Sequence, residues 1–290
     1  MIPDVCHVTL SDADHTVTLL GYVGEREPTG FVASSLSGFY SMPDLKVTQT
    51  ERQTGNGAHD VPEQEVLYAA RTVTLGCVVM GDGRAEVMRR LEELLRFSGR
   101  NIRMAVADGE RETYCDGHCR LDVGDVISDE AAKATLTLVC PRPERLSSEA
   151  LVLSMAPSTG STDGLQYTAD QVLVLPLDFG EVGSARNGCT LVNDGTSTAY
   201  PIITAIGDFP SGVAIYDRQT NEALVYPMQV GWQGVEFDCR SRIATSGGVD
   251  VTRHLTQRHF PTVRAGGSVS LFLSGGGSGT VTCTIRDTYI

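Results

Sequence analysis

The chain has 290 residues, 41% of them hydrophobic, and a formal net charge of −13. This length predicts two domains, each able to bury its own core. The negative charge argues against stable nucleic-acid binding, because phosphate recognition requires clustered positive charge. No run reaches the roughly 20 apolar residues that span a bilayer, so we expect no membrane insertion. The first residues lack a signal-peptide pattern, so we expect synthesis in the cytoplasm, where thiols stay reduced.

The first half of the sequence shows strand-like alternation interrupted by one helical pattern. Its strand-like runs are "CHVTL", "TVTLLGY", "LKVTQT", "RTVTLGCVVM", "NIRMAV", "RETYC", "HCRLDV" and "KATLTLVC". Asp108-Gly109 and Asp116-Gly117 are hairpin-turn signals, and together they predict a three-strand meander over 102–123.

Between the strands over 71–80 and 102–108, the segment "DGRAEVMRRLEELLRFSG" predicts an amphipathic helix. Asp82 is the expected N-cap and Gly99 the expected residue after the C-terminus. The apolar stripe should lie on a sheet, and the charged outer face is a candidate oligomer interface. The stripe comprises Val87, Met88, Leu91, Leu94 and Leu95.

A second feature of the first half is the polar segment over 49–66, "QTERQTGNGAHDVPEQEV". A segment of this length without a strand pattern is unusual in a compact domain. Three interpretations stay open: a functional loop, an extended arm or a disordered tip.

Five of the eight cysteines fall on the inward phase of strand-like runs, where cysteine acts as a small hydrophobe. They are Cys6, Cys77, Cys140, Cys239 and Cys283. The stretch "YCDGHCR" brings Cys115, His118 and Cys119 close in sequence, but a hairpin at Asp116-Gly117 would send them to two faces. No second cluster completes four zinc ligands, so we interpret the stretch as a turn and expect no metal and no cofactor.

The boundary between the predicted domains lies in the Pro-, Ser- and Gly-rich stretch after Cys140, and we divide the chain into 1–150 and 151–290. Eight short strand-like runs without a helix follow, from "QVLVLP" to "GTVTCTIRD". This pattern predicts a β-sandwich or jelly roll. The expected fold is therefore mainly β: a sandwich or barrel-like first domain with one helix and a hairpin, then a β-sandwich.

No nucleophile elbow, metalloprotease helix, phosphate loop or calcium loop is present, so we expect no enzyme activity. A carboxylate pair such as Asp178 and Glu181 is compatible with acid–base chemistry but lacks a visible pocket. The single tryptophan, Trp232, is expected to pack in the core or on a sheet.

The C-terminal block over 235–289 contains a recognisable order of motifs. It runs through a strand ending in Asp238, a basic turn with Arg240 and Arg242, the glycines Gly247 and Gly248, Phe260-Pro261 to Gly266, and a last strand with Arg286. This block resembles the distal tail (Dit-type) proteins of long-tailed, non-contractile bacteriophages. The order of elements in the first half, ending in "TLVCPRP", is similar to the same family.

The resemblance implies a structural protein of the virion tail tip. Residues 1–150 would form a six-fold ring between the tail tube and the tail hub protein, with the tape measure protein as a further neighbour. Residues 151–290 would be a galectin-like or carbohydrate-module-like sandwich outside the ring. The expected interface residues, on the polar segment and the helix, are Arg52, Asn56, Asp60, Glu63, Arg89, Glu93 and Arg96.

Two alternatives stay open beside this ring protein. In one, the C-terminal sandwich is a host-binding module that recognises a surface saccharide through Trp232 and Tyr226, with the first domain as its mount. In the other, the chain is a carbohydrate-active or metal-dependent hydrolase that uses residues such as Asp178 and Glu181.

Overall fold

The computed structural model describes residues 6–21, 30–48, 50–62, 66–109, 111–157 and 187–290. The described residues are mainly β, with 53% strand and 6% helix, which confirms the predicted fold class. The chain forms two compact units: residues 1–149 with 288–290, and residues 150–287. In the described part, no helix is long and apolar enough to cross a membrane.

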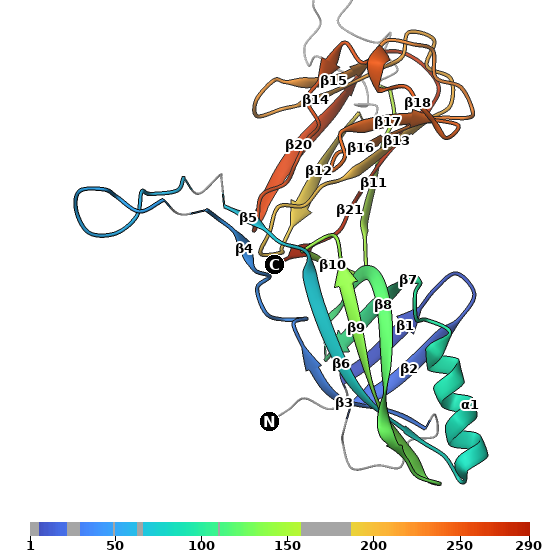
Figure 1. Ribbon diagram of the computed structural model, residues 1–290. Helices are drawn as coiled ribbons and strands as arrows, with labels where there is room; N and C mark the ends of the chain where they lie inside the picture. The colour runs from blue at the N-terminus through green and yellow to red at the C-terminus, as the bar shows by residue number, and fades with distance from the viewer. Residues whose placement is uncertain (1–5, 22–29, 49, 63–65, 110, 158–186) are drawn as a thin grey trace, which may run out of the picture. The chain divides into compact units, whose positions relative to one another are not determined.

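The first unit is built on a closed barrel (Figure 1). Among the described residues, seven strands follow one another in the order β8-β7-β1-β2-β3-β6-β9, and β9 pairs back onto β8 to close the ring. All pairs are antiparallel except β2–β3, which is parallel. The strands are β1 (Cys6–Ser11), β2 (Thr16–Gly21), β3 (Phe31–Ser37), β6 (Arg71–Met80), β7 (Asn101–Asp108), β8 (Arg111–Ile127) and β9 (Ala131–Cys140).

The barrel core is filled by side chains from every second residue of its strands. Along β6 every second residue is buried, from Arg71 through Val73, Leu75 and Cys77 to Val79. Such a period of two places one face of each strand inside and the other outside. The helix α1 (Arg84–Leu95) packs on β6, β8 and β9, and its buried residues join the same core.

The predicted hairpin at Asp116-Gly117 is wrong, because β8 runs straight through it as one 17-residue strand. At this point β8 changes partner: it pairs with β7 up to His118 and with β9 from His118 onward. A Cβ on Gly117 would lie 2.5 Å from the carbonyl oxygen of Val139. The glycine therefore permits a close approach of two strands at a barrel corner rather than a turn. The chain reverses later, where Ser128 and Ala131 bond across the tip.

Four further short strands complete the described part of the first unit. Strand β10 (Arg145–Ser147) adds to the edge of β8, and the last strand, β22 (Thr288–Tyr289), pairs with β10. The chain therefore leaves this unit after Glu149 and returns to it for its last three residues. Strands β4 (Leu45–Lys46) and β5 (Leu67–Tyr68) pair only with each other within the described residues.

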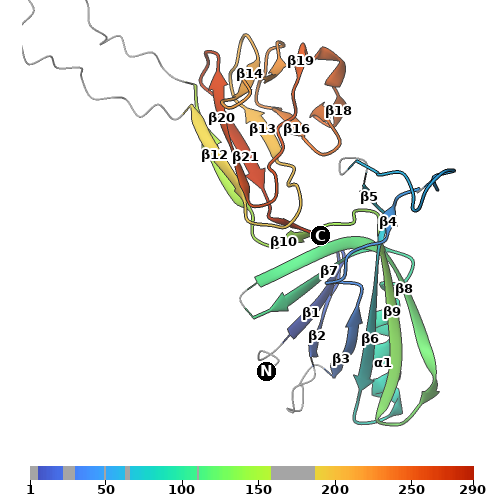
Figure 2. The same cartoon turned by 90° about the vertical axis from the view of Figure 1, so that its left-hand side faces the viewer.

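The second unit contains two antiparallel sheets that share one core (Figure 2). One sheet has the order β11-β21-β13-β16-β17-β18 and the other β12-β20-β14-β15-β19. Buried residues of both sheets, such as Phe237 and Leu271, belong to the same cluster, which makes the unit a β-sandwich. The strands of the first sheet are Leu151–Met155, Thr280–Ile285, Ile202–Ile206, Val235–Asp238, Ile243–Ser246 and Val249–Asp250. Those of the second are Gly188–Asn193, Gly267–Ser274, Val213–Asp217, Ala223–Tyr226 and Gln257–Arg258, and a short 3-10 helix spans Thr252–His254.

The cysteine prediction is confirmed for four of its five members: Cys77, Cys140, Cys239 and Cys283 are buried in the cores. The side chain of Cys6 lies outside the described residues. The predicted strand "QVLVLP" also lies outside the described part of the chain.

Candidate assembly surfaces

The helix α1 presents a mixed apolar and charged face. Val87, Leu91 and Leu94 point into the barrel core, whereas Met88 and Leu95 are exposed. The predicted stripe was therefore too wide, because its two flanking residues lie beyond the contact with the sheet. Met88 and Leu95 are seven residues apart and share one side of the helix.

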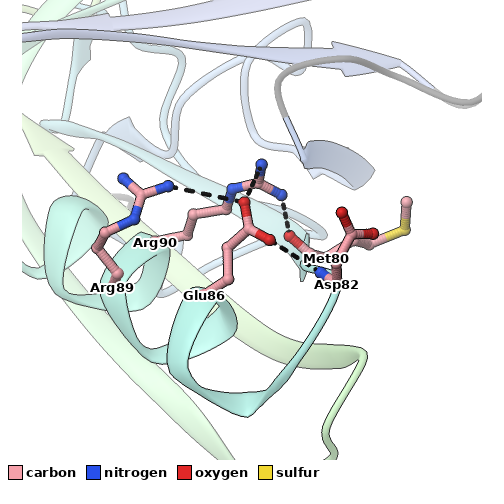
Figure 3. A network of polar contacts seen from close by, with 5 residues as sticks. All are labelled: Met80, Asp82, Glu86, Arg89 and Arg90. Atoms are coloured by element: carbon pink, nitrogen blue, oxygen red, sulfur yellow. Dashed lines mark hydrogen bonds and ion pairs between the residues drawn. The ribbon is translucent and has the colours of Figure 1, made fainter.

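The first turn of α1 is held by a polar network around Glu86 (Figure 3). Asp82 N–H donates to Glu86 Oε2 at 2.9 Å, and Glu86 Oε1 lies 2.8 Å from Arg90 and 3.8 Å from Arg89. Arg90 also donates to the carbonyl oxygen of Met80. The Asp82 hydrogen bond first, and then the two arginines, hold the pKa of Glu86 below its usual range. The predicted N-cap is wrong, since Gly83 occupies that position and Asp82 precedes it.

A buried arginine fixes the root of the segment between β3 and β6. Arg71 is 1% exposed and donates to the backbone carbonyls of Gly38, Phe39 and Ser41 at 2.6–2.8 Å. It also donates to Pro143 O at 2.6 Å. Burial, and next the charge of Arg145, lower the pKa of this guanidinium. The sequence analysis did not single out Arg71. The alternation of buried residues along β6, continued from Val73 to position 71, would have predicted that this arginine is buried.

A second arginine joins the same root to the end of the chain. The Arg145 guanidinium lies 5.1 Å from the ring of Phe39, 5.0 Å from that of Tyr40 and 5.8 Å from that of Tyr289. Such cation–π contacts bring the segment after β3, strand β10 and the C-terminal strand together. These contacts therefore hold the segment after β3 against β10 and the C-terminal strand within the first unit.

From this root the chain extends as a two-stranded arm, which we define as residues 42–70 (Figure 1). Among the three interpretations of the polar segment, the described residues favour the extended arm. Beyond β4 and β5, a bridge joins Glu51 to Ala58, and Arg52 lies 3.5 Å from Asp60. Met42 is 61% and Leu67 60% exposed, and Leu45 is exposed beside them. In the described part of the arm, no residue belongs to the barrel core.

The predicted interface residues fall into two separate groups. Arg52, Asn56 and Asp60 are exposed near the tip of the arm, and Glu63 lies outside the described residues. On α1, Arg89 and Arg96 are exposed, whereas Glu93 is half-buried. Figure 1 shows the arm and α1 on different sides of the barrel, so one chain does not bring the two groups together.

The two predicted saccharide-binding aromatics also have different environments. Trp232 is 86% exposed, at the tip of a turn in which Gly234 N–H bonds to Gly231 O. The expectation that Trp232 packs in the core is therefore wrong. Tyr226 is only 6% exposed and packs edge-on against Phe237, so its ring cannot stack on a sugar. The prediction that Tyr226 belongs to a saccharide-binding face is therefore wrong, because this residue lies in the core of the second unit.

Groups that could hold a metal ion do not gather in the described part of the chain. Among those residues, no three His, Cys, Asp or Glu side chains are placed to hold a metal ion. Cys115 and Cys119 both point into the barrel, while His118 between them is exposed. A hydrogen bond with Cys140, and next burial, raise the pKa of the Cys115 thiol. Asp178 and Glu181 lie outside the described residues.

Comparison with known proteins finds similarity at the level of the fold. No protein-family model matches the sequence, and no curated protein matches it. The crystal structure of the SPP1 Dit protein (gp 19.1), described as a hub adsorption apparatus of phages that infect Gram-positive bacteria, matches over 98% of this chain and 99% of its own. Its TM-score is 0.63, at 12% identity.

Chains of the phage P2 baseplate in its activated conformation give a similar result. With calcium, the match has a TM-score of 0.50 at 10% identity and covers 98% of each chain. With strontium, it has a TM-score of 0.50 at 8% identity and covers 97% of this chain and 98% of the other. The chain therefore has, over nearly its whole length, the two-unit fold of a Dit-type distal tail protein.

Proposed function

We propose that this protein is a structural component of the distal end of a bacteriophage tail. The observation that carries the proposal is the likeness to SPP1 Dit, which extends across both units with almost no unmatched chain on either side. A match of one β-sandwich alone would mean little, because that architecture serves many functions. A match that extends over both units of this chain is a far more particular finding.

In this proposal, residues 1–150 form a six-membered ring at the virion tail tip. The ring connects the tail tube above to the hub protein below, with the tape measure protein as a further neighbour. Residues 151–290 decorate the ring as a galectin-like or carbohydrate-module-like domain. The role is non-enzymatic, and the exposed arm and helix face supply the contacts between protomers.

Light scattering after size exclusion, followed by negative-stain images of the same peak, tests this function. The protein is measured alone and with the tail tube and hub proteins of the same phage. We expect a mass near six protomers and ring-shaped particles, either alone or with these partners. A protein that stays monomeric and binds neither partner would contradict the proposal.

A second candidate function, recognition of a host saccharide, rests on Trp232. An almost fully exposed indole at a turn tip is unusual, because tryptophan normally buries much of its surface. Glycan-array binding by the full-length protein tests it, with Trp232→Ala as the variant and Met228→Ala, also exposed, as the control. Binding that only Trp232→Ala abolishes would support recognition. Absence of binding to any glycan would contradict it and leave the ring function standing.

A further inference from the structure

Two cysteines of the second unit face each other between its sheets. Cys189 comes from β12 (Gly188–Asn193), the edge strand of one sheet, and Cys283 from β21 (Thr280–Ile285), which lies next to the edge strand of the other. Cα atoms of β12 and β21 approach within 8 Å of each other (Figure 2). Both side chains pack in the core of this unit, and their sulfurs share a hydrogen bond. Little backbone movement is therefore needed to bring the two sulfurs together.

The two thiols differ in their access to solvent. Cys283 is completely buried, whereas Cys189 is half-buried. A small oxidant in solution therefore meets Cys189 first. The hydrogen bond from Cys283 also lowers the pKa of Cys189, so more of its reactive thiolate is present at a given pH. Cys189 is thus suited to react with the oxidant, and Cys283 to react with Cys189 afterwards.

The barrel core holds a second pair of thiols in a different environment. Cys115 and Cys140 also share a hydrogen bond. They are 3% and 0% exposed, and they lie among the apolar side chains of the closed barrel. A solute reaches neither sulfur while the barrel stays closed. The same pairing of thiols thus occurs with access to solvent in the second unit and without it in the first.

We propose that Cys189 and Cys283 form a reversible disulfide that joins the two sheets of the second unit. With hydrogen peroxide as the oxidant, the Cys189 thiolate attacks one peroxide oxygen, the O–O bond breaks, and the departing hydroxide takes up a proton to become water. The Cys283 sulfur then attacks the sulfur of the resulting sulfenic acid. The S–O bond breaks, the S–S bond forms, and a second water leaves with the Cys283 proton. The two thiols lose two electrons, which the peroxide gains.

The disulfide should stabilise the second unit. It closes a loop that runs from β12 to β21 and contains most of this unit, and long closed loops restrict the unfolded chain most. We expect the melting temperature of the second unit to rise by about 10 °C on oxidation. The inference does not depend on the proposed tail function. In that role, oxidation would follow release of the virion from the reducing cytoplasm.

Mass spectrometry of the full-length protein tests the disulfide directly. The reduced protein is treated with hydrogen peroxide, unfolded, alkylated at its remaining thiols and digested. We expect a linked pair of peptides that joins Cys189 to Cys283, whereas Cys115 and Cys140 should be recovered as alkylated thiols. A Cys189 that is linked to another cysteine, oxidised without a link or left reduced would overturn the proposal. A link between Cys115 and Cys140 that forms equally fast would also contradict it, because access would then not decide the reaction.

Single alanine variants separate the roles of the two thiols. In Cys283→Ala, dimedone should trap a sulfenic acid at Cys189. In Cys189→Ala, the rise in melting temperature on oxidation should disappear. Cys239→Ala is the control, because Cys239 lies near Cys283 but is only 1% exposed, and this variant should keep both the link and the rise. A dithiol reductant should reverse the rise in the wild type. A rise that survives Cys189→Ala, or a link that gives no rise, would show that the disulfide does not stabilise this unit.

Discussion

The barrel and the arm are adjacent parts of one unit, yet they satisfy opposite physical requirements. In the barrel, β9 pairs with both β6 and β8, so the sheet has no open edge along the ring. Leucines such as Leu75 and Leu136 are completely buried there. In the arm, β4 and β5 pair only with each other among the described residues, and Leu45 and Leu67 face solvent.

The difference indicates that the barrel supplies the folding stability of the first unit, whereas the arm offers surface for contacts with other chains. A closed sheet with a filled core supplies folding free energy and leaves few hydrogen-bonding groups for other chains. An uncovered ribbon contributes little to folding, but it carries apolar and charged groups that a partner can bury. Arg71 lies at the junction, since it belongs to the inward face of β6 and holds the root of the arm.

Truncation of one leucine in the barrel and one in the arm should give the largest difference in the free energy of unfolding. Leu136→Ala should lower the free energy of unfolding by about 3 kcal/mol, because it leaves a cavity in a closed core. Leu67→Ala, the matched change in the arm, should alter it by less than about 0.5 kcal/mol. Denaturant unfolding, followed by hydrogen exchange in each unit, gives both values. Equal losses at the two positions would show that the arm is part of the folded core.

Removal of the guanidinium at the junction should have the next largest effect. Arg71→Met keeps the length of the side chain but leaves several buried carbonyls without a donor, and we expect a loss of about 3 kcal/mol or slightly less. Hydrogen exchange should rise first over 38–44. Arg120→Met, an exposed change, is the control. If the loss stays within about 0.5 kcal/mol, Arg71 does not anchor the arm.

Substitution of Gly117, where β8 passes close to β9, should lower the stability less than the change at Arg71. A methyl group there would meet the Val139 carbonyl at 2.5 Å, so Gly117→Ala should separate β8 from β9 and cost about 2 kcal/mol. Gly231→Ala is the control, because no atom lies within 4 Å of the added carbon. Equal melting temperatures for the two variants would contradict the close-approach explanation.

The helix network should give the smallest and most pH-dependent effect. Since the folded-state pKa of Glu86 is lowered, its stabilising contribution is present above the ordinary glutamate pKa and is lost as the pH falls through the folded-state value. Glu86→Gln should therefore lower the melting temperature at neutral pH, and the difference should disappear in strong acid. Glu92→Gln, exposed on the same helix, is the control. A difference that persists at low pH would point to packing instead of charge.

The sequence by itself determined the local features of this protein. The alternation of apolar and polar residues in "RTVTLGCVVM" identified β6 and the residues on its buried face. The spacing of apolar residues three and four positions apart identified α1. The Asp108-Gly109 turn was also readable, because Asp108 pairs with Arg111 across it. These features depend on residues that lie close in sequence, where periodicity and turn chemistry act directly.

Only the tertiary structure decided what depends on distant segments. The same dipeptide, Asp-Gly, is a turn at 108 and a strand interior at 116, because β9 approaches Gly117 and supplies a pairing partner. Likewise, Tyr226 is buried and Trp232 exposed, although both are aromatic residues in the same stretch. Burial, barrel closure and the exposure of the arm are set by contacts between strands far apart in the chain, and local sequence patterns do not encode those contacts.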